Sequence, residues 1–149
     1  MNAIGNRVSV VVGCIVVALA VAGPASATGK LAATEAVGTD GALTVSFNEP
    51  SQKKFASVSY RLAAEVAATW ACPDGSTVGT ASSSTATTTV VPGGNGHALG
   101  SVSLDAPTVP SSTCTQQLVL QQVDYTNVLL TNLATGHVYP LDSISRSFP

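Results

Sequence analysis

The chain has 149 residues, of which only 9% are charged. Six Lys and Arg residues and eight Asp and Glu residues give it a formal net charge of −2. This length is typical of one domain. No basic stretch offers the electrostatic footprint of a nucleic-acid-binding protein, so we expect no nucleic-acid partner. The scarcity of charged residues also leaves little material for catalytic acids and bases.

The first 27 residues have the order of a secretory signal peptide. Arg7 precedes an apolar run over residues 8–22, and Ala25 and Ala27 occupy the small-residue positions of an A-x-A cleavage site. We expect cleavage after Ala27, a mature chain that starts at Thr28, and a secreted, extracellular protein without a stable membrane anchor. A retained anchor is the alternative, because the apolar segment is about long enough to cross a ~30 Å bilayer core.

The cysteines predict a disulfide. Cys14 lies inside the apolar run of the signal, which leaves Cys72 and Cys114 as an even pair in an exported chain. A reactive Cys72 with His97 or His137 as its base is the alternative, but neither histidine lies in a recognisable thiol-protease context. No C-x-x-C or H-x-x-x-H spacing is present, so no metal site is predicted.

The mature chain begins with strand signals. Residues 28–41 predict a loosely ordered leader, and a strand from Ala42 to Phe47 ends in turn residues 48–51. From Val58 to Cys72 every second residue is apolar or small, which predicts one long half-buried strand with Trp70 in the core. A helix is the alternative, because the segment is rich in helix formers, but a helix would spread this alternation over all its faces.

The middle of the chain is rich in Ser and Thr. After a turn at 73–76, this composition is compatible with a glycosylated linker, but the Thr and Val content of residues 87–91 favours an exposed edge strand. Residues 92–96 predict a hairpin turn into a strand over 97–104. The segment "DAPTVPSSTCT", residues 105–115, contains two prolines and predicts an irregular loop or crossover.

The last third predicts a strand over residues 117–123 that continues over 125–130, with a β-bulge where the alternation changes phase near Gln121 and Gln122. A turn at 132–136, a return strand at 137–141 and a closing segment at 143–148 follow. About seven strands without a helix predict an all-β fold. We expect a two-sheet antiparallel sandwich of immunoglobulin-like architecture over residues 42–149, stapled by one disulfide.

Two stretches carry a resemblance to a known family. "SVSYRLAAEVAATWAC" and "LVLQQVDYTNVLLTNLATG" resemble a family of small secreted β-proteins from actinobacteria and some filamentous fungi. Its members share a signal peptide, one cysteine pair and an L-V-L-x-x-V-x-Y-T-N-V-x-L-T pattern. The resemblance covers most of the mature chain. It implies export and an all-β fold, and it supplies neither an activity nor a catalytic residue.

No catalytic, cofactor-binding or metal-binding residue is predicted. The nucleophile motif G-x-S-x-G is absent, because Gly75 to Gly79 has the wrong spacing. Any two of six carboxylates could in principle pair for glycoside cleavage, but solvated turn and strand-end positions are the preferred interpretation. These carboxylates are Glu49, Glu65, Asp74, Asp105, Asp124 and Asp142.

Three functions from different classes follow. The first is a secreted, non-catalytic module of the extracellular space or cell envelope, whose loops bind an extracellular protein or glycan. The second is a secreted protease inhibitor that uses the 105–115 loop, whose prolines and cysteine would lower the entropy lost on docking. The third and least supported is a small hydrolase.

Overall fold

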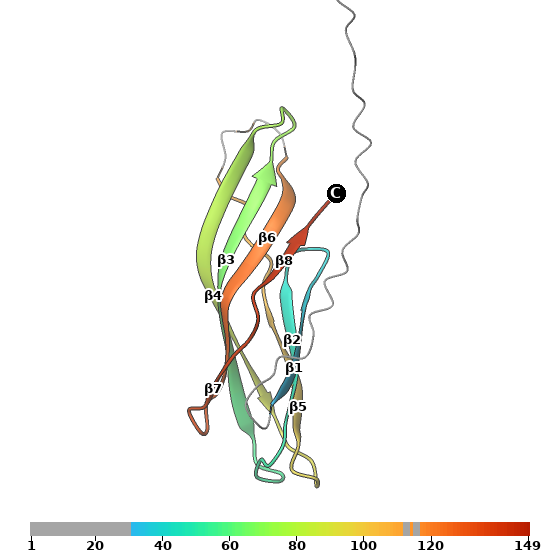
Figure 1. The fold of residues 1–149 in the computed structure, drawn as a ribbon, viewed down its shortest axis with the longest axis vertical. Coiled ribbons are helices and arrows are strands. Elements are labelled where there is room, and N and C mark those ends of the chain that lie inside the picture. The colour runs from blue at the N-terminus through green and yellow to red at the C-terminus, as the bar shows by residue number, and fades with distance from the viewer. Residues whose placement is uncertain (1–30, 112–113, 115–116) are drawn as a thin grey trace, which may run out of the picture.

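The computed structural model in Figure 1 describes residues 31–111, 114 and 117–149, which form eight strands in two antiparallel sheets. The smaller sheet has the order β1-β2-β5 and contains β1 (Ala32–Val37), β2 (Leu43–Glu49) and β5 (Ala98–Leu104). The larger sheet has the order β4-β3-β6-β7, and its β6 also pairs with β8. It contains β3 (Val58–Ala71), β4 (Thr77–Val90), β6 (Val119–Asn132), β7 (Val138–Pro140) and β8 (Ile144–Ser147). The predicted all-β sandwich is confirmed.

The core lies between the two sheets, and period-2 alternation builds it. Along β3 the inward set from Val58 to Trp70 is buried, with Tyr60 and Leu62 fully so, and Trp70 is only 6% exposed. Tyr125 on β6 is also fully buried, as expected, and its hydroxyl donates to the Gly41 carbonyl at 2.7 Å. The helix alternative for residues 58–72 is therefore wrong, because strand geometry keeps every second side chain on one face.

The expectation of a loosely ordered leader over residues 28–41 is wrong for its described part, residues 31–41. Residues 32–37 form β1, which pairs along its whole length with β2, and Leu31, Ala33 and Val37 are buried in the core. The inward position between Ala33 and Val37 is Glu35, and this charge concealed the strand alternation in the sequence. Residues 28–30 and the predicted signal peptide, residues 1–27 with Cys14 and the Ala27 cleavage site, lie outside the described residues.

The Ser/Thr-rich stretch is an edge strand, as predicted, but a much longer one. β4 occupies the edge of the larger sheet and pairs with β3 over all 14 of its residues, from Thr77 rather than from residue 87. Because the whole segment is paired with β3, the linker alternative is wrong. Its small hydroxyl side chains fit a pleated edge strand without adding bulk or charge.

Two irregularities in β6 account for its change of phase. Thr69 pairs with Gln122 and Trp70 with Leu120, which leaves Gln121 as the extra residue of the predicted bulge. A second register shift lies at Asn127, which has a positive φ of 49°. Each extra residue re-aims the side chains that follow it, so both halves of this strand can bury an apolar set.

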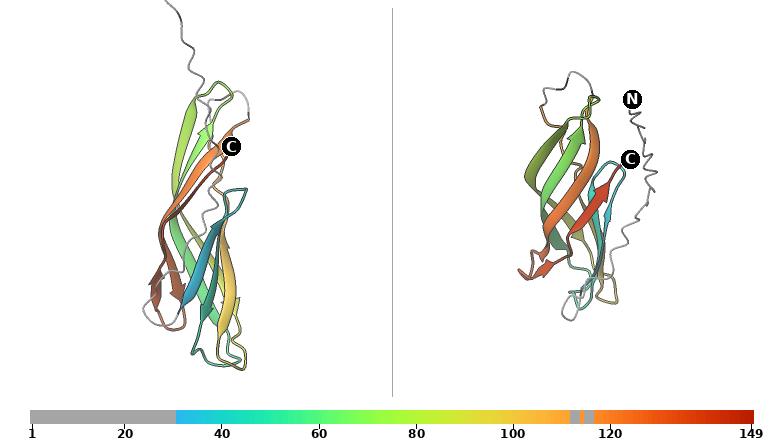
Figure 2. Two further views of the ribbon diagram at one scale, coloured as in Figure 1. Left: turned by 45° about the vertical axis from the view of Figure 1, so that its right-hand side comes forward. Right: turned by 45° about the horizontal axis from the view of Figure 1, so that its top comes forward.

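The sandwich is elongated, and β3, β4 and β6 extend at the top of Figure 1 beyond the smaller sheet. At the bottom, three connections gather in all three views (Figures 1 and 2): residues 50–57 after β2, residues 91–97 after β4 and residues 133–137 after β6. We call this the three-loop end. In the part of the chain that the structure describes, no helix is long and apolar enough to span a membrane.

Candidate functional site

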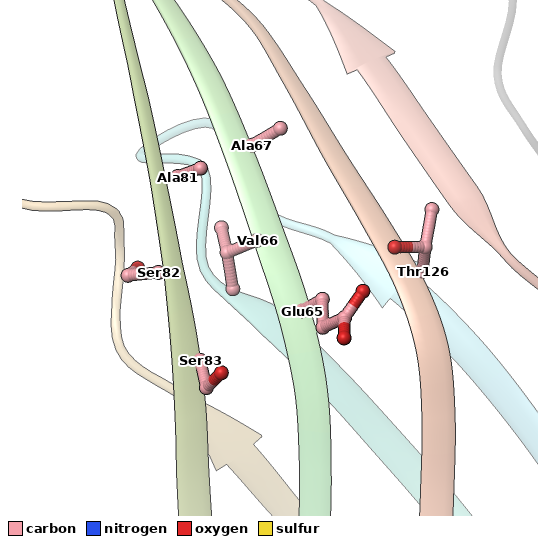
Figure 3. Close-up of a pocket in the computed structure, with 7 residues that line it drawn as sticks. All are labelled: Glu65, Val66, Ala67, Ala81, Ser82, Ser83 and Thr126. Atoms are coloured by element: carbon pink, nitrogen blue, oxygen red, sulfur yellow. The ribbon is translucent and has the colours of Figure 1, made fainter.

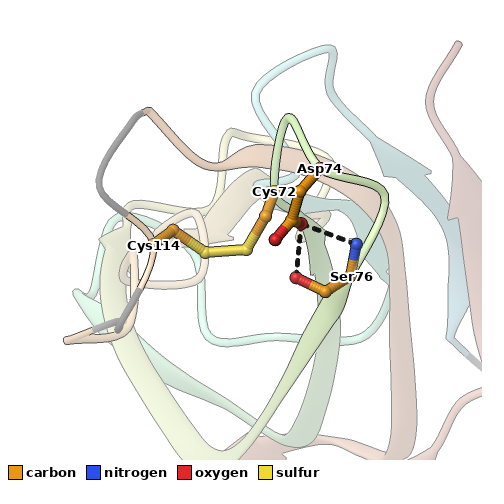
Figure 4. Close-up of a disulfide and its surroundings, with 4 residues drawn as sticks. All are labelled: Cys72, Asp74, Ser76 and Cys114. Atoms are coloured by element: carbon orange, nitrogen blue, oxygen red, sulfur yellow. Dashed lines mark hydrogen bonds between the residues drawn. A yellow bond between two sulfur atoms is a disulfide. The ribbon is translucent and has the colours of Figure 1, made fainter.

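The disulfide lies beside the β3–β4 turn, at the opposite end of the long strands from the three loops (Figure 1). Cys72 and Cys114 are bonded (Figure 4), with their Cα atoms 6.1 Å apart and 42 positions between them in sequence. The predicted disulfide is thereby confirmed, and the reactive-nucleophile alternative is wrong because neither sulfur is a free thiol. Next to Cys72, the Asp74 carboxylate accepts hydrogen bonds from the Ser76 amide and hydroxyl, which lower the pKa of Asp74. Both features stabilise the β3–β4 turn.

A buried carboxylate lies at the base of the three-loop end. Glu49, the last residue of β2, is only 4% exposed and accepts hydrogen bonds from three donors. The Tyr60 hydroxyl and the Asn132 amide reach its Oε2 at 2.6 and 2.9 Å, and the Tyr139 hydroxyl donates to its Oε1. A buried carboxylate is costly unless such donors replace its water. The interpretation of Glu49 as a solvated strand-end residue is therefore wrong.

This Glu49 cluster joins the bases of the three loops. The Asn132 amide also donates to Gln52 in the first loop, at 3.3 Å, and the Asn132 side-chain oxygen accepts from the Ala134 and Thr135 amides in the third. The backbone N–H of Gln52 in turn donates to the Gly96 carbonyl of the second loop, at 2.8 Å. One buried network thus fixes all three connections relative to the sheets.

The tyrosines of the cluster are held in their neutral, donating form. Burial raises the pKa of Tyr60 and of Tyr139 well above the ordinary value, and the hydrogen bond to Glu49 and its negative charge act in the same direction. Neither hydroxyl can therefore serve as a base at neutral pH. The cluster is suited to holding a scaffold in place rather than to moving a proton.

The first loop presents its side chains from a strained backbone. Ser51 and Phe55 adopt left-handed φ values of 65° and 58°, which are uncommon for residues other than Gly and costly for a bulky one. The Phe55 amide donates to the Pro92 carbonyl at 2.9 Å, which fixes this geometry against the second loop. Phe55 is nevertheless 75% exposed, directly after the exposed Lys53 and Lys54.

Exposed apolar side chains concentrate at the three-loop end. Of the eight large hydrophobic residues exposed in the described part of the chain, five lie in these loops or at the adjoining strand ends: Phe55, Val91, Leu99, Leu133 and Val138. Scattered exposed apolar residues are normal, but a cluster at one end marks an interaction surface.

Charge is also unequally distributed along the molecule. Asp74 lies in the turn at the far end, and Asp40 and Asp105 adjoin the end of the smaller sheet that is away from the three loops. Glu65 and Asp124 lie midway along the long strands, and Asp142 lies in the connection between β7 and β8. The three loops contain Lys53 and Lys54 and no acidic residue, and the only carboxylate beneath them is the buried Glu49. The three-loop end therefore combines positive charge with apolar surface in a chain that is acidic overall.

Both histidines of the chain lie in the three loops, at the ends of the second and third. His137 is exposed immediately before β7, and its ring lies 4.5 Å from that of Tyr139. His97 is half-buried before β5, with its Nδ1 2.9 Å from the Asn48 side-chain oxygen. In the described ranges, no three His, Cys, Asp or Glu side chains lie close enough together to hold a metal ion.

A shallow groove of about 360 Å³ crosses the middle of the larger sheet (Figure 3). Glu65 stands between Ser83 and Thr126 on the neighbouring strands and accepts a hydrogen bond from the Asn127 amide at 2.9 Å. The lining residues carry no aromatic ring for a sugar to stack on and no basic group: Glu65, Val66, Ala67, Ala81, Ser82, Ser83 and Thr126. This groove is a weaker candidate than the three-loop end.

A second buried carboxyl, Glu35, has no evident structural partner. It is 4% exposed, and among the described residues neither of its oxygens has a hydrogen-bond partner. Burial raises the pKa of Glu35, and the nearby negative charge of Asp142 adds to this effect. Glu35 is therefore held toward its neutral form between the sheets, where it offers a pH-dependent weakness in the core.

Comparisons with protein-family models, with curated proteins and with solved structures find no match to this chain. The choice of the three-loop end as the candidate site therefore depends on its geometry and composition alone. Sequence reasoning missed it, because the cluster depends on three connections that are far apart in the chain. The only local signal was the Lys-Lys-Phe run, residues 53–55, within a turn-rich segment.

Proposed function

We propose that the chain is a secreted, non-catalytic binding module that docks through its three-loop end, in the extracellular space or at the cell envelope. The observation that carries this proposal is that the three-loop end has exposed apolar and cationic side chains at its surface and a buried hydrogen-bonded cluster at its base. Exposed Phe55 and two lysines lie on the first loop, and the base of this loop is hydrogen-bonded through Gln52 to the buried Glu49 cluster. Such pre-organisation lowers the entropy lost on binding.

Secretion is supported by the order of the signal-like segment and by the disulfide, since disulfides persist in oxidising compartments. The resemblance to small secreted β-proteins of actinobacteria and fungi points the same way. A catalytic role has less support. The buried Glu49 carboxylate already accepts hydrogen bonds from three donors, so its oxygens are engaged within the protein.

A protease inhibitor that uses the 105–115 loop is the second candidate, and one contact counts against it. The Pro107 ring lies so close to Gly41 that a Cβ at that glycine would be 3.2 Å from Pro107 Cδ. The first part of the loop therefore packs on the sandwich instead of projecting from it, whereas inhibitor loops need to enter a protease cleft.

Retention on the cell envelope tests this function. We would express the tagged full-length chain in a secreting bacterial host and compare Phe55→Ser and Lys53→Gln/Lys54→Gln with matched changes at the other end, Val119→Ser and Thr77→Glu/Gln117→Glu. The proposal predicts that the first two variants lose retention on intact cells and the matched variants keep it. Equal retention of all four, or retention that depends on residues 105–111, would contradict it.

A further inference from the structure

The three-loop end combines features that suit a particular class of partner. Its exposed side chains are apolar and cationic: Phe55 and Leu133 lie with Lys53 and Lys54 on loops free of acidic residues, and Val138 lies at the adjoining start of β7. A purely polyanionic partner would use the lysines and leave the apolar side chains in water. An uncharged glycan would have no use for the lysines.

We propose that the three-loop end binds reversibly to the surface of an anionic lipid bilayer. Lys53 and Lys54 contact headgroup phosphates, and Phe55 enters the boundary between headgroups and acyl chains. This inference rests on the proposed function and names the partner of that same end. Lysines facing the headgroups and apolar residues facing the acyl chains are the arrangement of peripheral membrane elements.

Charge complementarity favours an anionic partner, and the exposed apolar side chains beside the lysines favour a bilayer among anionic partners. The exposed carboxylates of the described residues lie outside the three loops, in the β3–β4 turn, at the opposite end of the smaller sheet, midway along the long strands and in the β7–β8 connection, so most of the negative charge is held away from the three loops. A molecule of this polarity approaches an anionic plane with its lysines foremost. The elongated sandwich then stands on its end, because the loops lie at one extremity of its long axis (Figure 1).

The binding this surface supports is weak and reversible. One lysine near an anionic membrane changes the affinity about fivefold, so the pair accounts for roughly 30-fold. Partial burial of the Phe55 ring adds a factor on the order of ten. An affinity of this size is that of a peripheral contact that salt can dissociate. It is much weaker than that of a membrane-spanning helix or a stable lipid anchor.

Vesicle binding tests the inference. Every variant is prepared as the host exports it, so the N-terminus is identical throughout, and is sedimented with vesicles of phosphatidylglycerol and phosphatidylcholine or of phosphatidylcholine alone. We expect binding to the anionic vesicles that declines with salt, and a roughly 30-fold loss of affinity for Lys53→Gln/Lys54→Gln. The charge-matched control Thr77→Glu/Gln117→Glu should keep its affinity within about twofold, because both substitutions lie at the far end.

The substitution Phe55→Trp separates a bilayer from a soluble anion. We expect the emission of the introduced indole to shift to the blue on anionic vesicles and not with inorganic polyphosphate, relative to the Trp70 background of the parent. Equal binding to polyphosphate without a shift would replace the bilayer with a polyanion, and no vesicle binding at low salt would overturn the inference. Envelope retention that persists in that case would leave the proposed function intact and assign the end to another partner.

Discussion

Replacing Glu49 by Ala removes the acceptor on which the three-loop end is built. The substitution leaves the hydroxyls of Tyr60 and Tyr139 without their partner, while the Asn132 amide keeps only its longer bond to Gln52. A buried donor left unsatisfied costs about 1–3 kcal/mol. Two hydroxyls would lose their acceptor and one amide would lose its shorter hydrogen bond. We therefore expect a loss of about 3–5 kcal/mol from the free energy of unfolding.

Urea denaturation followed by Trp70 fluorescence measures this loss, and Glu65→Ala is the matched control. Glu65 is exposed and accepts one hydrogen bond, from Asn127, so its removal should cost less than about 1 kcal/mol. Because total stabilities are only about 5–15 kcal/mol, Tyr139→Phe serves as a milder second variant with an expected loss of about 1–2 kcal/mol. If Glu49→Ala cost no more than Glu65→Ala, the Glu49 cluster would not be the support described above.

Three further predictions address separate parts of the molecule. Cys72→Ser should lower the stability by about 2–4 kcal/mol in chemical denaturation and leave binding by the folded fraction intact, and two titratable thiols in the native parent would contradict this. Stability should decline as the pH rises from 4.5 through the raised pKa of Glu35, since the folded state holds that proton more tightly than the unfolded state. Glu35→Gln should abolish this slope in melting curves recorded between about pH 4 and pH 8, and an unchanged slope would assign it to another group. Phe55→Gly should raise the melting temperature, because glycine accepts the left-handed φ at a gain of up to about 1 kcal/mol, while weakening envelope retention, and a lowered melting temperature would show that the Phe55 ring stabilises the fold.

The sequence predicted those parts of the fold that depend on local alternation. The apolar set from Val58 to Trp70 and the phase change at Gln121 each follow from period-2 patterning, and the structure has both. β1 escaped prediction because Glu35 interrupts its inward set, and the early part of β4 did so because small polar residues carry little strand signal. In both cases pairing with a neighbouring strand outweighed weak local preference.

The candidate site could not be predicted in the same way. Glu49 follows an apolar strand and precedes a proline, which is the context of a solvated turn residue. Its burial depends on Tyr60, Asn132 and Tyr139 arriving from three other strands, with sequence separations of 11, 83 and 90. No local pattern in a single sequence specifies that convergence. The exposed Lys-Lys-Phe run likewise gains meaning only when the topology brings the other two loops beside it.

Hydrogen–deuterium exchange of the exported protein, with and without intact host envelope, would locate the docking surface on the molecule. We expect slower exchange at residues 50–57, 91–97 and 133–137 on binding, and unchanged exchange at the β3–β4 turn, residues 73–76. Protection confined to residues 105–111, or spread over the groove around Glu65, would contradict the assignment of the three-loop end as the docking surface.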